Sequence, residues 1–242
     1  MTKLNPGRVT RDDVARVAGT SVAVVSYVIN NGPRPVAKQT RQRVLDAIAS
    51  TGYRPNGVAQ ALASGKTRTY GLIVPNIANA FIASFAHALQ QEALDNGLVI
   101  LLGDSGDCRK RELNLINSLL SQRVDGLFYT SVDRHPHIDL IQASGTPFVM
   151  LDRVDPALRV NMLRVDERAA ARQVAAHLLS HGYREAGIIC GPLAMLNAQD
   201  RLNGWRDALA EHGLDEQAEW VVSANYTRQG GYDATQQLLA NG

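Results

Sequence analysis

Side chains suited to binding a small polar molecule follow the ends of four short apolar runs. The runs are typical of buried strands and cover residues 70–74, 147–151, 186–190 and 220–223. The side chains after them offer aromatic rings, amides, a carboxylate and guanidinium groups: Asn79, Phe81, Asp152, Arg153, Asn197, Arg201 and Tyr226. Because ligands bind beyond the carboxyl ends of strands in open α/β sheets, this set predicts a site for a polyhydroxylated or polar ligand. Two simpler explanations stay open: loops at strand ends are commonly polar, and Asp152 and Arg153 could form a structural ion pair.

The sequence lacks the local motifs of common catalytic and nucleotide-binding sites. It has no GxGxxG after a strand, no GxxxxGK[ST], no HExxH and no GxSxG. The six histidines are scattered, and Cys108 and Cys190 form neither a CxxC pair nor a metal-binding cluster. We therefore expect that the protein is not an enzyme, that it uses no metal or cofactor, and that both thiols are free in a reducing compartment.

The composition is that of an ordinary globular chain with one or two domains. Hydrophobic residues make up 45% and charged residues 20% of the 242 residues, which excludes a collagen, a disordered polymer and a disulfide scaffold. No apolar run approaches the roughly 18 to 20 residues that span a bilayer. The first residues also lack the apolar core of a signal peptide. We expect a protein that is neither membrane-embedded nor secreted by a standard signal.

The charge is divided unevenly along the chain. Residues 1–68 hold eleven Lys and Arg against three acidic residues, a net charge of +8, whereas the remainder carries a net charge of −6. A basic head on a mildly acidic body is typical of a nucleic-acid-binding module attached to another domain. A solvated basic face explains the charge equally well, so the motifs must decide.

The basic region contains the signals of three short helices. Thr10 can cap the first helix with Asp13 in the capping-box position, and Ser21 can cap a second helix that runs to about Asn30. A third helix is expected over residues 37–51. Their predicted apolar faces are Val14, Ala15, Val17 and Ala18, then Val24, Val25, Val28 and Ile29, then Val44, Leu45 and Ile48. The first two helices make a helix-turn-helix, whose second helix would lie in the major groove of DNA.

Beyond residue 68, short apolar runs alternate with helical periods. Strands are expected at 70–74, 98–102, 124–129, 147–151 and 160–165, with helices at 81–96, 112–121, 138–143 and 167–181. The series restarts with a strand at 186–190, a helix at 202–212, a strand at 220–223 and a helix at 230–240. This alternation predicts two α/β lobes with parallel sheets.

The ordered motifs resemble those of the lactose-repressor (LacI/GalR) family of bacterial transcription factors. The head carries VTRDDVA at 9–15, AGTS at 18–21, VSYVIN at 25–30, GYRPN at 52–56 and VAQALA at 58–63. The body carries QRVDGL at 122–127, MLDR at 150–153, HGYR at 181–184 and RLNGW at 201–205. The resemblance covers essentially the whole chain.

The resemblance implies a DNA-binding role for residues of the head. Val22, Ala23 and Tyr27 match positions that read bases in the major groove, and Thr10, Ser21, Ser26 and Asn30 match positions that hold phosphates. Asn56 belongs to the same DNA-binding set, and Leu62 matches a leucine that paired hinge helices insert into the minor groove. Val22 and Ala23 could instead be packing residues, and Leu62 could be a core leucine.

The resemblance also implies an architecture and a set of partners. It predicts an all-α helix-turn-helix head and an α/β body of two doubly wound parallel-sheet lobes, similar to periplasmic binding proteins, with the second lobe incomplete. The expected divisions are 1–54 for DNA binding, 55–68 for the hinge helix and linker, 69–165 for the first lobe and 166–242 for the second. Such a protein is a cytoplasmic, nucleoid-associated regulator, in most cases a repressor. It binds a palindromic operator as a homodimer, and a small effector such as a sugar, held by the strand-end residues, modulates its affinity.

Two further hypotheses come from other readings of the same sequence. An α/β solute-binding or metabolic protein could carry an incidental basic head, and a truncated DNA-binding protein could be insensitive to any effector. Family members usually continue beyond the position of Gly242 with the rest of the second lobe. We therefore expect the sequence to be either a fragment or a naturally shortened member.

Overall fold

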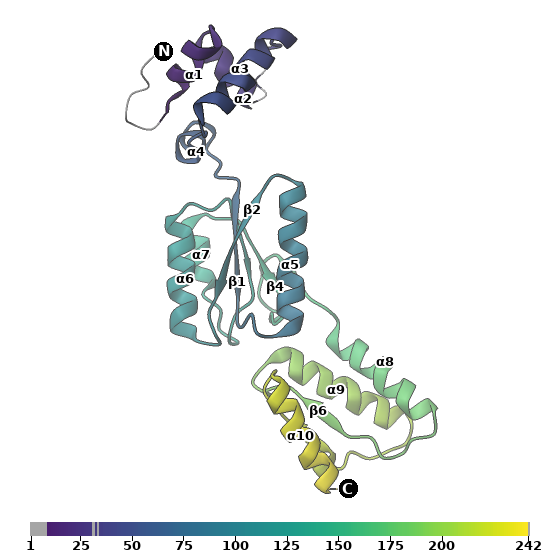
Figure 1. Cartoon of the computed structure of the whole chain (residues 1–242). Helices are drawn as coiled ribbons and strands as arrows, with labels where there is room; N and C mark the ends of the chain where they lie inside the picture. The colour runs from purple at the N-terminus through teal and green to yellow at the C-terminus, as the bar shows by residue number, and fades with distance from the viewer. Residues whose placement is uncertain (1–8, 31, 33, 242) are drawn as a thin grey trace. The chain divides into compact units, whose positions relative to one another are not determined.

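The chain forms two compact units that are described separately below. The computed structural model describes residues 9–30, 32 and 34–241 (Figure 1). Contacts divide the chain into Met1–Gly65, here called the head, and Lys66–Gly242, here called the body. Among the described residues, none of the helices is both long and apolar enough to cross a membrane.

Among the described residues of the head, all regular secondary structure is helical. The head contains α1 (Arg11–Ala18), α2 (Val22–Asn30), α3 (Lys38–Thr51) and α4 (Gly57–Ser64). The predicted capping box of α1 is confirmed, because the Asp13 N–H donates to Thr10 Oγ1 over 3.4 Å and the Thr10 N–H donates to the Asp13 carboxylate over 3.0 Å. Gly19 ends α1 with a φ of +62°, a left-handed conformation that favours glycine.

The head core corrects two of the predicted inward-facing residues. Val14, Val25 and Val44 are fully buried, but Val17 is 54% exposed and Leu45 is 43% exposed. The buried stripe of α1 runs through residues 14, 15 and 18, and that of α3 runs through 44, 47 and 48. At about 100° per residue, Val17 and Leu45 lie roughly a quarter of a turn or more from the centres of these stripes. They therefore face outward although they stand beside buried residues in the sequence.

The first lobe of the body is a five-stranded parallel sheet. Its strands are β1 (Thr69–Val74), β2 (Val99–Asp104), β3 (Gly126–Tyr129), β4 (Phe148–Leu151) and β5 (Met162–Leu163), in the order β2-β1-β3-β4-β5. Its helices are α5 (Ala80–Asp95), α6 (Arg109–Ser121) and α7 (Ile138–Ser144). Figure 1 shows α5 on one face of the sheet and α6 and α7 on the other. This is the doubly wound arrangement expected from the sequence.

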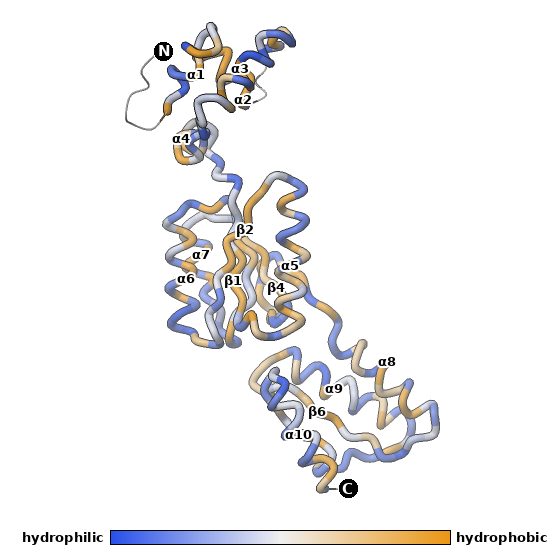
Figure 2. The backbone as a smooth tube through the Cα atoms, in the orientation of Figure 1, coloured by the Kyte–Doolittle hydropathy of each residue, from blue (hydrophilic) through white to orange (hydrophobic). Residues whose placement is uncertain are grey.

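The core of the first lobe surrounds the central strands. Leu72, Ile73 and Val74 of β1 are fully buried, and Figure 2 shows hydrophobic residues concentrated along β1 and β4. Close packing explains the glycine at position 71, because a Cβ there would lie 2.5 Å from a methyl carbon of Leu127. Parallel sheets are covered on both faces, which explains the continuous apolar runs of these strands.

The strand predicted over residues 160–165 is much shorter than expected. Only Met162 and Leu163 pair with β4, opposite Met150 and Leu151. Val160 packs against the core without extending the ladder. Leu163 is 63% exposed and Val165 is 56% exposed, so this apolar run indicated neither a long strand nor a buried segment.

The second lobe contains a two-stranded parallel sheet. Its elements are α8 (Glu167–Ser180), β6 (Ile188–Cys190), α9 (Leu196–Glu211), the short 3₁₀ helix η1 (Ala218–Trp220), β7 (Val221–Ser223) and α10 (Arg228–Asn241). The helix predicted from Leu202 begins six residues earlier, at Leu196. No side chain caps its first turn, and Asn197 and Ala198 are nevertheless buried. Tertiary packing therefore stabilises these first turns, although the sequence contains neither a capping residue nor a helical spacing of apolar residues there.

We expect the head to lose stability as the pH falls below about 4, the ordinary pKa of an aspartate. Hydrogen bonds from the backbone and hydroxyl of Thr10 favour the ionised carboxylate and, with Arg16, hold the pKa of Asp13 below its usual value. Since the folded pKa is depressed, this stabilisation is present above the unfolded pKa and is lost as the pH falls through the folded one. Thermal melts of residues 1–65 from pH 2.5 to 7 should show a shallower acid dependence for Asp13→Asn. Equal slopes would contradict the assignment.

Candidate functional site

The start of α2 presents small side chains at the surface of the head. Ser21 and Ala23 are exposed, and Val22 is 37% exposed. Val25 and Val28, on the opposite face of the helix, pack in the core of the head. Val22 and Ala23 are therefore available at the surface of the head and are not core packing residues. Tyr27, one turn further along α2, is half-buried.

The predicted phosphate-binding side chains also hold the helices in place. The hydroxyl of Ser21 accepts from the Val24 N–H over 3.4 Å, and that of Ser26 accepts from Asn30 Nδ2 over 3.2 Å. Asn30 Oδ1 accepts in turn from Gln60 Nε2 of α4 over 3.1 Å. This bond ties α4 to the end of α2. Gln60 was absent from the sequence-based set, because no spacing rule relates positions that are thirty residues apart.

Helix α4 carries an apolar stripe on its exposed side. Asn56 caps the helix, its Oδ1 accepting from the Val58 N–H over 3.1 Å. Val58 is 80% exposed and Leu62 is 85% exposed. Residues four apart lie on the same face of a helix, so these two side chains form one apolar strip. Leu62 is therefore no core leucine of the head, and the strip is suited to contact with another molecule.

Basic side chains surround these helices. Arg34, Lys38, Arg43 and Arg54 are exposed, and the acidic residues of the head are few. Arg16 is paired with Asp13 within α1. The remaining positive charge is suited to a polyanion such as the DNA backbone.

In the body, three of the predicted ligand residues, Arg153, Asn197 and Arg201, contact Tyr226, whereas Phe81 lines a separate cavity with Asp152. The guanidinium carbon of Arg153 lies 5.1 Å from the ring centre, and that of Arg201 lies 6.0 Å from it. The Tyr226 hydroxyl donates to Asn197 Oδ1 over 3.4 Å. Burial raises the pKa of Tyr226, and the two arginines oppose that rise. The structure thus brings together residues from three separate strand ends. The sequence placed Asn197 and Arg201 in the segment before a helix that begins at Leu202. In the structure both residues lie in the first turns of α9.

Asp152 and Arg153 follow β4 as a close pair. Asp152 has a φ of +62°, unusual for a residue other than glycine, and its carboxylate lies 3.7 Å from Arg153 Nε. Burial raises the pKa of Asp152, Arg153 opposes that rise, and Glu167 adds to it. Arg153 Nε is buried and has no hydrogen-bond partner within the described part of the chain. The pair is therefore only partly satisfied by the protein, which suits a ligand-binding position better than a purely structural one.

Arg201 is held by a carboxylate that sequence analysis missed. Its Nε and Nη2 donate to the two carboxylate oxygens of Glu167 over 2.7 and 2.8 Å. Hydrogen bonding to Glu167 raises the pKa of Arg201. Glu167 is the first residue of α8, and no local spacing relates it to Arg201, which lies thirty-four residues further along the chain.

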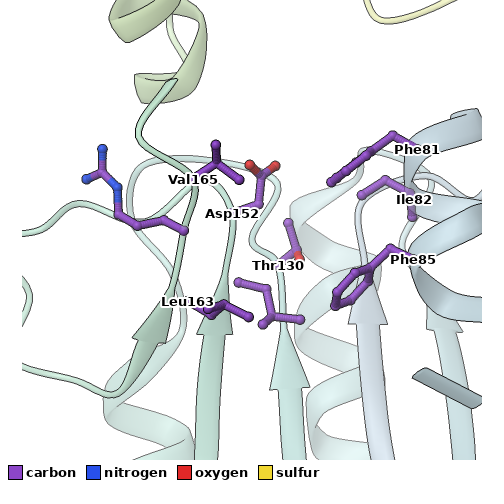
Figure 3. Close-up of a pocket in the computed structure, with 9 residues that line it drawn as sticks. Phe81, Ile82, Phe85, Thr130, Asp152, Leu163 and Val165 are labelled. Atoms are coloured by element: carbon purple, nitrogen blue, oxygen red, sulfur yellow. The ribbon is translucent and has the colours of Figure 1, made fainter. Parts of the chain in front are cut away.

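Two cavities lie beside these residues. One of about 250 Å³ is shown in Figure 3, where Phe81, Ile82 and Phe85 face Leu163 and Val165, with Thr130 and Asp152 between them. A second cavity of about 380 Å³ is lined by polar and aromatic groups, among them Asn76, Asn79, Asp107, Arg153 and Tyr226. The oxygen of Asn79 already caps α5, accepting from the Phe81 N–H over 3.0 Å.

Other residues of the cavities carried a weaker sequence signal. Asn76 lies two residues beyond the end of β1 and could have been found by the strand-end rule, whereas the apolar lining looked like ordinary core. No group of three or more metal-ligating side chains occurs in the part of the chain that the structure describes. The cysteines Cys108 and Cys190 are both free.

Comparison with known proteins identifies the family. Residues 10–56 match the model of bacterial regulatory proteins of the lacI family, and residues 67–242 match that of periplasmic binding proteins and the sugar-binding domain of the LacI family. Catabolite control protein A of Priestia megaterium is 34% identical over 233 residues, which are 96% of this chain and 70% of that protein. The chain belongs to the LacI family. It is a DNA-binding regulator of the LacI/GalR type, with a head and body of the family fold.

Two further comparisons support this membership. The transcriptional regulator GalR of Escherichia coli is 33% identical over 235 residues, covering 96% of this chain and 68% of GalR. The Lac repressor dimer, solved with operator and the anti-inducer ONPF, matches with a TM-score of 0.82 at 27% identity. That match covers 98% of this chain and 71% of the repressor.

The exposure of Leu62 leads to a prediction about stability. Leu62→Ala should change the free energy of unfolding of residues 1–65 by less than about 0.5 kcal/mol, because the side chain is already in solvent. The matched control Val25→Ala should cost about 2 kcal/mol, since Val25 is fully buried. Thermal or urea unfolding monitored by circular dichroism measures both. A comparable loss in the two variants would show that Leu62 packs in the head core.

Proposed function

We propose that this protein is a bacterial transcriptional repressor that binds a palindromic operator as a homodimer and responds to a small effector. In this proposal residues 1–54 bind DNA, 55–68 form the hinge helix and linker, and 69–165 and 166–242 form the two lobes that hold the effector. The observation that carries it is a helix-turn-helix in a basic head, with the first residues of α2 exposed, in a chain of the LacI family. A two-fold protein would match a two-fold operator.

The first residues of α2 are proposed to read base edges. Val22 and Ala23 would sense thymine methyl groups through apolar contact, and Tyr27 would add a ring with a hydrogen-bonding end. Thr10, Ser21, Ser26, Asn30 and Asn56 would contact phosphates and fix the register. These polar groups already stabilise helix ends or α2 itself, so they would meet DNA in defined positions.

The strip of Val58 and Leu62 on α4 is proposed to insert into the minor groove at the centre of the operator. Wedging apolar side chains between base pairs costs a few kcal/mol of unstacking, which added contacts to bent DNA offset. The solved Lac repressor dimer, to which this chain is similar, is bound to its operator. Exposed leucine and valine side chains four residues apart are suited to this role.

The effector is proposed to be a sugar or related metabolite bound by Asn79, Phe81, Asp152, Arg153, Asn197, Arg201 and Tyr226. The two cavities and the partly satisfied Asp152–Arg153 pair support this site, as does the match to a sugar-binding domain. Charge-assisted hydrogen bonds from the arginines would orient the ligand. The protein is proposed to act in the cytoplasm at the nucleoid, with no catalytic activity, since the relatives compared are regulators.

Operator binding can be tested by fluorescence anisotropy against a library of palindromic duplexes. We expect salt-dependent binding, with affinity falling steeply between about 50 and 200 mM salt because phosphate contacts release counterions. Leu62→Ala should weaken binding to the selected duplex at least about tenfold and binding to a random duplex by less than about twofold. Failure to bind any duplex would defeat the proposal, and equal losses on both duplexes would contradict the wedge.

The effector response can be tested with a panel of sugars and related metabolites. An active compound should change operator affinity by about 5- to 150-fold. Arg201→Ala should abolish that change while leaving ligand-free operator binding intact. Arg206→Ala is the matched control, because Arg206 lies on the same helix but pairs with Glu216 at the surface. A response retained in Arg201→Ala would remove Arg201 from the site.

A further inference from the structure

The chain enters the body through a short segment that a single carboxylate holds. The Thr67 N–H and hydroxyl donate to Asp125 Oδ1 over 2.8 and 2.9 Å, and the Arg68 N–H donates to Asp125 Oδ2 over 2.9 Å. The Asp125 N–H donates in return to the Thr69 carbonyl over 2.7 Å. Asp125 immediately precedes β3, and Thr69 begins β1. The carboxylate therefore fastens the incoming segment to the amino end of the neighbouring strand.

Arg68 completes this attachment on the other side of β1. Its Nε and Nη2 donate to the carbonyls of Gly97 and Asn96, in the turn that follows α5, over 3.0 and 3.2 Å. Its own carbonyl accepts from the Val99 N–H over 3.0 Å. Arg68 also has a φ of +55°, a conformation that residues with a Cβ adopt rarely and keep only when surrounding contacts enforce it.

The electrostatics agree with the geometry. Burial alone would raise the pKa of Asp125, but hydrogen bonds from Thr67 and Arg68 outweigh it and lower the pKa. The carboxylate is thus held ionised, the form that accepts hydrogen bonds without donating any. A neutral amide at this position would present an N–H₂ group to one of the donors.

Only two residues separate this attachment from the hinge helix. Helix α4 ends at Ser64, Gly65 follows with a φ of +70°, and Thr67 is already bonded to Asp125. The covalent connection between Ser64 and Thr67 is therefore only two residues long, Gly65 and Lys66. If the amino end of β3 moved, Asp125 would therefore move Thr67 and Arg68, which are close in sequence to α4.

We propose that Asp125 is a positioning residue that fixes the exit of the hinge segment from the first lobe and so transmits the state of the body to the hinge helix. This inference rests on the proposed function, because it assigns a consequence for operator binding. Asp125 itself touches neither DNA nor effector in this scheme. It acts by holding Thr67 and Arg68.

Limited trypsinolysis of the full chain tests the attachment without DNA or effector. Trypsin cleaves after arginine, and in the wild type both the backbone and the side chain of Arg68 are hydrogen-bonded to the body. Asp125→Ala should speed cleavage after Arg68 by about tenfold or more, read by mass spectrometry, because the local open state becomes more populated. The control Asp215→Ala removes an exposed loop carboxylate and should leave the rate unchanged.

Two milder variants keep the test valid if Asp125→Ala fails to fold. Thr67→Val removes one hydroxyl donor, and Asp125→Asn retains one acceptor oxygen, so both should speed the same cleavage to a smaller extent while the melting temperature of the body stays within about 3 °C of the wild type. Unchanged cleavage after Arg68 in folded variants would overturn the proposal.

Operator binding supplies the functional arm. On a duplex selected from the palindromic library, Asp125→Ala should lose at least about tenfold of its preference over a random duplex, whereas Asp215→Ala should keep it. Faster cleavage with an undiminished preference would overturn the transmitting role. If the wild type binds no duplex, the proposed function fails, whereas the cleavage result still decides whether Asp125 holds the segment.

Discussion

The parallel arrangement of the first sheet is the constraint on which the functional organisation depends. Because all strands run the same way, their amino ends share one edge and their carboxyl ends share the other. The linker from the hinge helix enters at the first edge, through Thr67 and Arg68. The proposed ligand residues Phe81 and Asp152 follow strands at the second edge. Six residues of β1, about 20 Å at the usual rise, separate the two.

Strand β1, which spans the distance between these edges, is closely packed between β2 and β3. Its last three residues are fully buried, and it is hydrogen-bonded along its length to β2 and on its other side to β3. Close packing leaves such a strand few alternative positions. In the proposed scheme, a ligand at the carboxyl edge would therefore displace whole elements, including the segment just before β3 that contains Asp125. Coupling by rigid displacement needs firm attachments at each end, and the bonds to Thr67 and Arg68 supply one of them.

Much of this organisation could be predicted from the sequence, and the failures have physical causes. Caps and glycines at helix ends act locally, so the capping box of Thr10 and Asp13 was readable from two residues. The start of α9 and the partnership of Glu167 with Arg201 depend on tertiary contacts that no local pattern encodes. Val17 and Leu45 were misplaced because adjacent apolar residues differ by about 100° around a helix. The DNA-reading roles were predicted from family resemblance, and the effector residues from both their positions after strand ends and that resemblance. The structure supplies their surroundings.

At this carboxyl edge, the Asp152–Arg153 pair proposed to bind the ligand is only partly satisfied by hydrogen bonds within the described residues. Asp152 is held in a left-handed conformation with its carboxylate partly buried, and Arg153 Nε has no protein partner among the described residues. Leaving buried polar groups unpaired costs free energy. A ligand that supplied the missing hydrogen bonds would recover that cost only in the arrangement where Arg153, Arg201 and Tyr226 meet it together. A small molecule favours one state of the body over another when it can complete these hydrogen bonds in that state and not in the other.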